Sequence, residues 1–169
     1  MLDNVLIITA HSDDEVIGCG GAISYHLTKK DRVTCIYLTD GVSARKDNKY
    51  QINKRAQYAQ KAEKVLGFTF LKNFCGKFKD QRLDEISLIK IIKILEEVKK
   101  KINPSIVYTH FPHDLNKDHR IVSEATNVAF RPMQGSKLKK LIYFEIPSTT
   151  KNSIDKQFVP NYYLDISKI

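Results

Sequence analysis

Short runs of β-branched and aliphatic residues alternate with amphipathic segments along the whole chain, and this alternation limits the folds that the chain can adopt. The runs that predict strands are 5–10, 33–38, 68–71, 105–109 and 141–146. The segments with helical spacing are 16–27, 52–66, 86–98 and 121–130. Right-handed crossovers place helices on both faces of such a sheet. We therefore expect a three-layer, Rossmann-like α/β fold with a mostly parallel sheet and helices on both faces.

Length and composition agree with one domain. The 169 residues, 42% of them apolar, are enough to bury a core without disulfide bonds. Neither an internal repeat nor a low-complexity linker divides the chain, so we expect a single domain over residues 1–169. The polar segment 148–157 is expected to form a surface loop.

Three cysteines, Cys19, Cys35 and Cys75, are widely spaced and form no CxxC pair. A reduced, cytoplasmic compartment is the simpler interpretation. No stretch reaches the roughly 18 apolar residues that a membrane-spanning helix needs, and the first residues lack the basic start of a signal peptide. We therefore expect no transmembrane segment.

Basic residues exceed acidic ones by 28 to 19, giving a net charge of +9. Such an excess can attract phosphates, nucleic acid or an anionic membrane surface. The basic residues are scattered, however, with small clusters only at 99–101 and 137–140, and they form no stripe interleaved with aromatic residues. A lysine-rich solvated surface, with no nucleic-acid partner, is the favoured interpretation.

A polar cluster follows the first predicted strand and contains His11, Asp13, Asp14 and Glu15. Repulsion between neighbouring carboxylates is costly unless a cation compensates it. Catalytic zinc commonly takes three ligands from histidine and carboxylate side chains and leaves one position for water, and His11 and Asp14 can supply two of them. The alternative is an acidic helix N-terminus whose carboxylates bond free backbone amides without a metal.

A second polar cluster, ending in Asp118 and His119, follows a later strand and lies on the same sheet edge if the strands are parallel. His119 completes a His₂Asp set, and Asp13 is then free to act as general base toward a metal-activated water. Taken singly, His119 fits a helix-entry histidine, and His110 and His113 fit ordinary loop polarity. The coincidence of two such clusters favours a metal site.

The glycines Gly18, Gly20 and Gly21 do not have the spacing of a dinucleotide-binding GxGxxG turn. The carboxylates beside them would also repel a pyrophosphate. Close packing of a helix against the sheet explains these glycines better.

At these residues the chain resembles the LmbE-like, or PIG-L, family of zinc-dependent N-deacetylases, whose signature is AHPDDE followed by a glycine-rich helix start. The matching residues, in chain order, are 10–15, 18–21, 38–41, Arg55, 66–67 and 114–120. The resemblance implies zinc ligands at His11, Asp14 and His119, with another divalent metal such as Fe²⁺ as an alternative. It implies Asp13 as the catalytic base.

The resemblance also implies roles for residues around the metal. Arg55 corresponds to a sugar-contacting arginine, and Glu15 and Asp114 are expected to be further substrate-binding residues. Asn116 stands where several branches of the family have a histidine that stabilises the oxyanion, oriented by the residue that matches Asp118. We keep both as catalytic candidates, although an asparagine amide donates a hydrogen bond and no proton.

Two further departures concern Ser12, which replaces a proline of the signature, and the C-terminal end. Many relatives continue past residue 169 with a helix and a strand that help to wall the pocket. The domain is therefore either truncated or completed by another subunit, so a homo-oligomer stays open.

The leading hypothesis is a zinc-dependent hydrolase that removes an N-acetyl group from an amino sugar or an amino-sugar conjugate. A catalytically impaired metal- or sugar-binding member of the same fold is the second hypothesis. A basic nucleic-acid-binding protein is a third and weaker one, motivated by the net charge of +9 alone.

Overall fold

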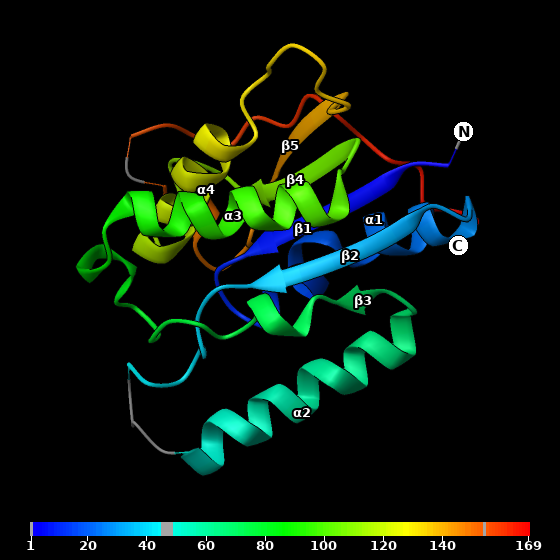
Figure 1. Cartoon of the computed structure of the whole chain (residues 1–169). Coiled ribbons are helices and arrows are strands. Elements are labelled where there is room, and N and C mark those ends of the chain that lie inside the picture. Colours follow the sequence, from blue (N-terminus) through cyan, green and yellow to red (C-terminus); the bar gives the residue numbers. More distant parts are fainter. Residues whose placement is uncertain (1, 45–48, 154) are drawn as a thin grey trace.

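The computed structural model describes residues 2–44, 49–153 and 155–169 (Figure 1). Its strands are β1 (Asn4–Thr9), β2 (Arg32–Tyr37), β3 (Thr69–Phe70), β4 (Ile106–His110) and β5 (Lys140–Phe144). Its helices are α1 (Asp14–Thr28), α2 (Lys49–Leu66), α3 (Leu88–Ile102) and α4 (Lys117–Ala129), with short 3₁₀ turns at Lys72–Phe74, Leu83–Glu85 and Thr150–Asn152. No helix within these ranges is both long and apolar enough to cross a membrane.

The strands form one sheet in the order β3-β2-β1-β4-β5, and every neighbouring pair is parallel. From β1 the chain first moves outward through β2 to β3, and it then returns to the other side of β1 for β4 and β5. The order therefore reverses between β1 and β4. In open α/β sheets this reversal marks the ligand-binding crevice, beyond the carboxyl ends of the two strands.

Helices cover both faces of the sheet, as the sequence predicts (Figure 1). Alternate residues of β1 point to opposite faces, so Leu6 and Ile8 join one core, and Val5 and Ile7 the other. The first core contains side chains of α3 and α4, among them Ile91, Leu95, Val122 and Ala125. The second contains side chains of α1 and α2, among them Cys19, Ile23 and Ala59. The three-layer α/β prediction is confirmed.

The observed helix boundaries differ from the expected ones where the polar clusters lie. The helix α1 begins at Asp14, and α4 begins at Lys117, four residues before the predicted start. The cause at α4 is a cap, because the Asn116 side chain accepts a hydrogen bond from the backbone N–H of Asp118. Both polar clusters therefore contribute residues from the first turn of a helix.

The prediction of a surface loop over residues 148–157 is wrong at Thr150, and residue 154 lies outside the described residues. Thr150 is fully buried, and its hydroxyl accepts a hydrogen bond from the backbone N–H of Ile146 at 2.7 Å. Lys151, Asn152 and the described residues 155–157 are exposed, as expected. The sequence showed the polarity of this segment but not its hydrogen-bond partners.

Gly18 lets α1 pack closely on the sheet, which confirms the packing interpretation for this glycine. A Cβ atom there would lie 2.4 Å from Phe144 Cδ2 and 3.1 Å from the backbone oxygen of Glu145. Gly18→Ala is therefore expected to lower the free energy of unfolding by about 1–3 kcal/mol, the usual cost of overpacking. Urea denaturation of the metal-free protein would measure the change.

The packing interpretation is wrong for Gly20, because a Cβ atom there would meet nothing within 4 Å. Since Gly20 lies in the same helix as Gly18, it supplies the matched control. Gly20→Ala is expected to raise the free energy of unfolding by about 0.5–1 kcal/mol, since alanine favours the helix. Equal effects of the two substitutions would contradict the packing role of Gly18.

Candidate metal centre

The two polar clusters meet beyond the carboxyl ends of β1 and β4, which are adjacent parallel strands. The chain leaves β1 at Thr9 and reaches His11 two residues later. It leaves β4 at His110 and reaches His119 in the first turn of α4. Residues more than 100 positions apart thus lie side by side at the point where the strand order reverses.

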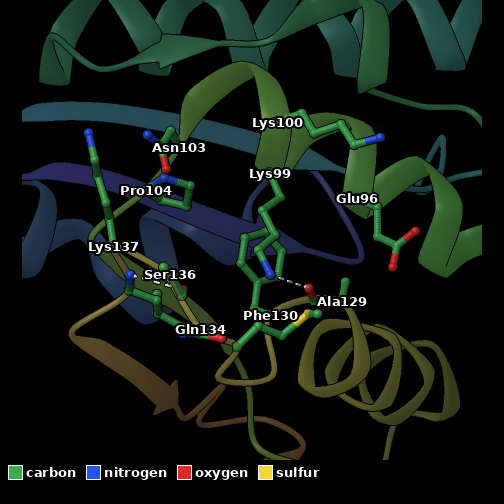
Figure 2. Close-up of a pocket in the computed structure, with 13 residues that line it drawn as sticks. Glu96, Lys99, Lys100, Asn103, Pro104, Ala129, Phe130, Gln134, Ser136 and Lys137 are labelled. Atoms are coloured by element: carbon green, nitrogen blue, oxygen red, sulfur yellow. Dashed lines mark hydrogen bonds between the residues drawn. The ribbon is translucent and has the colours of Figure 1, made fainter.

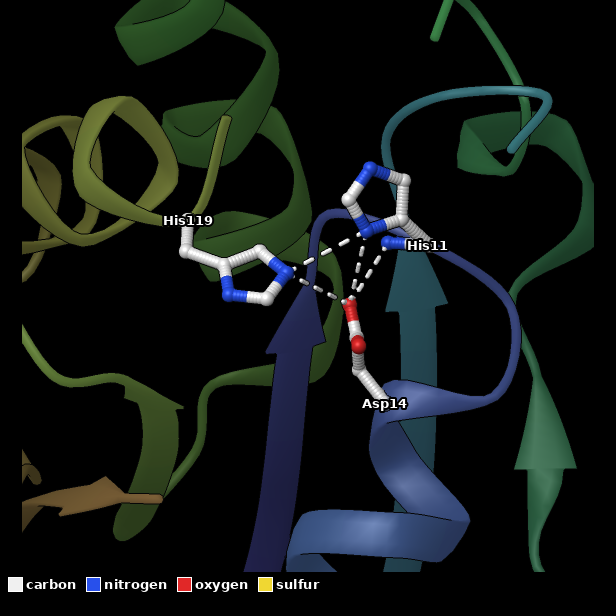
Figure 3. A group of neighbouring side chains, drawn as sticks. All are labelled: His11, Asp14 and His119. Carbon is white, nitrogen blue, oxygen red and sulfur yellow. Dashed lines mark hydrogen bonds and ion pairs between the residues drawn. The ribbon is translucent and has the colours of Figure 1, made fainter. Parts of the chain in front are cut away.

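His11, Asp14 and His119 point toward one another from these elements (Figure 3). Asp14 Oδ2 lies 3.2 Å from His11 Nδ1 and 3.5 Å from His119 Nε2, and the two nitrogens lie 3.2 Å apart. All three residues are buried. Tetrahedral ligands of zinc, each about 2.0–2.2 Å from the ion, lie about 3.3–3.6 Å from one another. The three separations are thus close to those of a His₂Asp zinc site.

The hydrogen bonds around His119 leave one ring nitrogen available for a metal. His119 Nδ1 lies 3.1 Å from Asp114 Oδ1, so it carries the proton that the carboxylate accepts. In the neutral ring the lone pair then lies on Nε2, which faces Asp14 Oδ2. A lone pair directed at a buried carboxylate is unfavourable unless a cation lies between them. The residues present therefore fit a divalent metal.

Protons compete with a metal for this site. Burial alone would lower the pKa of His11, but the carboxylates of Asp118, Asp14 and Asp80 outweigh it and raise the pKa of His11 to about 11. Burial opposes the charged form of His119 too, yet Asp114 and Asp14 raise its pKa. The metal-free site therefore holds protons on imidazole nitrogens that a metal has to displace.

The affinity of this cluster for a divalent metal is accordingly expected to rise with pH, because each ion that binds has to release imidazole protons. Each displaced proton contributes about one order of magnitude in affinity per pH unit, below the pKa of the ring that loses it. Isothermal titration in buffers of different ionisation enthalpy would count the released protons. An affinity that is constant or falls over the neutral range would contradict this site.

Two carboxylates lie at the other nitrogen of His11. His11 Nε2 is 3.1 Å from Asp80 Oδ1 and 3.6 Å from Asp118 Oδ2. Histidine ligands of metals usually donate their second N–H to a carboxylate, a backbone carbonyl or water, which fixes the tautomer and the ring orientation. Asp118 also accepts hydrogen bonds from the backbone N–H groups of Gln81 and Leu83, at 2.8 and 3.2 Å. Asp118 thereby holds the loop that carries Asp80.

Asp13 lies beside the cluster of His11, Asp14 and His119 but is not part of it. Its Oδ1 lies 2.7 Å from Arg55 Nη2 in an ion pair, and about half of the Asp13 side chain is exposed. Gly41 makes room for this arginine, because a Cβ atom at Gly41 would lie 2.6 Å from Arg55 Nε. Gly41 also has φ +67°, a conformation that favours glycine. The turn at Asp40 and Gly41, after β2, thus leaves the space that the Arg55 side chain occupies.

His11, Asp14, His119, Asp13 and Arg55 line one pocket of about 650 Å³. Its lining consists of His11, Asp13, Asp14, Ile17, Gly41, Val42, Gln51, Arg55, Asp80, Gln81, Asn116, His119, Ile146, Ser148 and Thr149. Most of the lining side chains are polar. The pocket therefore offers many hydrogen-bond donors and acceptors beside the ligand cluster.

Two of the expected substrate-binding residues have other places in the structure. Glu15 is 1% exposed and does not line the pocket, its carboxylate oxygens have no hydrogen-bond partner among the described residues, and burial raises its pKa to about 8. Asp114 is fully buried and bonds protein groups with both oxygens. Arg55 does line the pocket, as expected. The structure thus leaves Glu15 and Asp114 without the exposed oxygen that a substrate contact needs.

The two expected catalytic residues of the second cluster also separate. Asn116 lines the pocket, but its side-chain oxygen caps α4. The Asp118 carboxylate bonds the backbone of the loop at 81–83 rather than the Asn116 side chain. The amide nitrogen of Asn116 remains as its donor toward a ligand.

The loop interpretation of His110 is wrong, because this residue lies in β4, and sequence reasoning missed Asp80. His110 is fully buried at the end of β4, stacks on His119 with ring centroids 3.9 Å apart, and has Nε2 3.4 Å from Asp14 Oδ2. Its Nε2 accepts a hydrogen bond from the backbone N–H of Ala10, and burial lowers its pKa to about 4. The signal for His110 was its place at the end of a buried strand, the same place that His11 has after β1. Nothing in the irregular segment around Asp80 marked that residue.

A second cavity, of about 440 Å³, lies near the amino ends of β4 and β5 (Figure 2). Lys99 donates a hydrogen bond there to the backbone oxygen of Ala129 and lies over the ring of Phe130. None of the residues predicted for catalysis or metal binding lines this cavity. Lys99 thus connects the C-terminal ends of α3 and α4.

The chain is similar in sequence to known proteins. A family model described as GlcNAc-PI de-N-acetylase, PIG-L, matches residues 6–130. The chain is 30% identical over 152 residues to a protein of Escherichia coli K12 named uncharacterized deacetylase YaiS, a match that covers 86% of this chain and 75% of that one.

Solved structures share the fold at lower identity. The N,N'-diacetylchitobiose deacetylase of Pyrococcus horikoshii has a TM-score of 0.72 and 20% identity, covering 96% of this chain and 64% of that one. GalB of Pseudomonas putida KT2440, a 4-carboxy-2-hydroxymuconate hydratase, also has a TM-score of 0.72, with 23% identity and coverage of 98% and 73%. These likenesses show the fold alone, and the fold accommodates more than one reaction. On the extent of the family match, this chain belongs to the PIG-L family of de-N-acetylases.

Proposed function

We propose that this protein is a zinc-dependent hydrolase that removes the acetyl group from the nitrogen of an amino sugar or an amino-sugar conjugate. The observation that carries the proposal is the joint placement of a His₂Asp ligand set and the carboxylate of Asp13 at one polar pocket. Membership of a deacetylase family supports the reaction class. The name of the Pyrococcus protein supports an amino-sugar substrate.

The ligands His11, Asp14 and His119 would hold the zinc ion, with Fe²⁺ as an alternative. When bound, such an ion polarises an amide carbonyl and makes a water molecule more acidic. Asp13 takes the proton of the attacking water and passes it to the amide nitrogen as the carbon–nitrogen bond breaks. The ion pair with Arg55 fixes the place of the Asp13 carboxylate beside the ligands.

Asn116 and four polar side chains of the pocket complete the proposed mechanism. The Asn116 amide nitrogen donates a hydrogen bond to the negative charge that develops on the carbonyl oxygen. Arg55, Gln51, Asp80 and Ser148 line the pocket and offer partners for sugar hydroxyl groups. A pocket of about 650 Å³ lies within the range usual for small-molecule sites.

We also propose that the protein works in the cytoplasm. Its three cysteines, Cys19, Cys35 and Cys75, are free thiols, as a reducing compartment requires.

A panel of substrates tests the proposed function. Zinc-loaded protein would be incubated with N-acetylglucosamine, N,N'-diacetylchitobiose, a nucleotide-linked and a lipid-linked N-acetylglucosamine, and released acetate and amine would be measured. We expect acetate and amine in equal amounts from at least one substrate, loss of both after chelation, and recovery on adding zinc.

The second candidate is a member of the family that binds a metal or a sugar without turning it over. The observation that favours it is that the Asn116 side-chain oxygen is committed to capping α4, where other branches of the family have a histidine. Stoichiometric zinc and sugar binding without acetate release from any substrate would support this candidate and overturn the proposed hydrolase.

A further inference from the structure

The carboxylate of Asp114 joins the metal ligand His119 to the wall of the pocket. Asp114 Oδ1 lies 3.1 Å from His119 Nδ1 and accepts a hydrogen bond from the backbone N–H of Asn116 at 2.8 Å. Asp114 Oδ2 accepts hydrogen bonds from the hydroxyls of Thr149, at 3.1 Å, and Thr150, at 2.5 Å. Each oxygen therefore serves a different part of the site.

The threonine side of this carboxylate belongs to the pocket. Ser148 and Thr149 line the cavity, and Thr150 lies buried behind them without touching it. The Thr150 hydroxyl donates to Asp114 and accepts from the backbone N–H of Ile146, and its own backbone N–H donates to the Ile146 oxygen at 2.8 Å. The turn at 146–150 is thus held from one side by Asp114.

We propose that Asp114 is a positioning residue that couples metal binding at His119 to the conformation of the pocket wall at 148–150. The substrate part of this proposal rests on the proposed function. The two oxygens of a carboxylate belong to one rigid plane, so a rotation that weakens the bonds to the threonines also moves the oxygen that orients the His119 ring. Asp114 has no exposed atom with which to contact a substrate itself.

The coupling has to act in both directions. A wall held in place keeps Asp114 oriented toward His119 and favours metal binding, and a bound metal fixes His119 and through it the carboxylate and the wall. Thermodynamic linkage requires that the metal and a pocket ligand strengthen each other's binding by the same factor. Loss of the contacts between the threonines and Asp114 should therefore weaken metal binding at His119, which the threonines do not contact.

Thr150→Val tests this proposal, because valine keeps the shape of threonine and removes the hydroxyl. We expect the zinc affinity to fall by about tenfold, in the range usual for partners of a metal ligand, together with a rise in KM. Thr150→Ser restores the hydroxyl and should restore both quantities. Zinc affinity is measured by competition with a chromophoric chelator, which needs no activity.

A second measurement tests whether zinc and a pocket ligand strengthen each other's binding. Zinc affinity of the wild-type protein would be compared with and without saturating glucosamine, the amine product of N-acetylglucosamine hydrolysis. We expect tighter zinc binding with the amine in the wild-type protein, and a smaller factor in Thr150→Val. If that variant does not fold, Thr149→Val with Thr149→Ser as control replaces it, since the Thr149 hydroxyl also donates to Asp114.

The outcomes separate this inference from the proposed function. A wild-type protein that binds no zinc at His11, Asp14 and His119 would overturn the proposed function. A wild-type protein that binds zinc, with a Thr150→Val variant of equal zinc affinity or equal loss in Thr150→Ser, would overturn the coupling alone. A lower melting temperature in Thr150→Val without a change in zinc affinity would also overturn it.

Discussion

Asp13→Asn is expected to lower kcat by about 10²–10⁴-fold while one zinc ion stays bound. The amide keeps the size of the carboxylate but cannot take a proton from the attacking water. Asp13 is not one of the three converging ligands, so its replacement leaves their geometry intact. Steady-state kinetics on the substrate found in the panel, together with metal analysis of the purified variant, would measure both effects.

Asp84→Asn is the matched control for this substitution. Asp84 is also a carboxylate 2.7 Å from a cation, Lys117 Nζ, but it does not line the pocket. Solvent-exposed ion pairs contribute little to stability, so both variants should fold. An Asp13→Asn protein with the activity of Asp84→Asn would exclude Asp13 as the base.

The central part of the site could be predicted because its residue types are those that bind a cation. Carboxylates and imidazoles at the ends of two buried strands require a cation, and parallel strands bring those ends together. His11, Asp14 and His119 converge as that reasoning expected. The order of strands and helices was equally readable, because burial on both sheet faces imposes continuous apolar runs such as 5–10.

The groups around the ligands could not be predicted, because their roles depend on contacts between distant segments. Asp80 comes from a stretch without periodicity, and it reaches His11 because Asp118 binds the backbone of its loop. Asp114 meets Thr150 across 36 positions of sequence. A polar residue in a loop has no pattern that states which distant partner it will find.

Asn116 shows how one residue can serve the fold and the site together. Asparagine is among the best N-cap residues, and its side-chain oxygen begins α4 one turn early, which places His119 in the first turn of that helix. The amide nitrogen is then left for the proposed hydrogen bond to the oxyanion. Asparagine at this position therefore also caps α4, a role for which histidine is less suited.

His119→Ala is expected to abolish both zinc binding and turnover. The substitution removes one of three ligands and leaves the buried Asp14 carboxylate with fewer compensating groups. Changes to residues that merely orient a ligand cost about 10–100-fold in metal affinity, so the loss of a ligand itself should exceed about 100-fold. Equilibrium dialysis against buffered zinc would measure the affinity, and the acetate assay would measure turnover.

His113→Ala is the control, because His113 lies in the loop before α4, about one-quarter exposed, and pairs with Asp155 rather than with the ligand cluster. Its zinc affinity and turnover should match the wild-type values. Melting curves of the metal-free proteins separate ligand loss from unfolding, because neither protein then gains stability from the ion. If His119→Ala binds zinc as tightly as His113→Ala, the metal is held elsewhere, and the His₂Asp assignment is wrong.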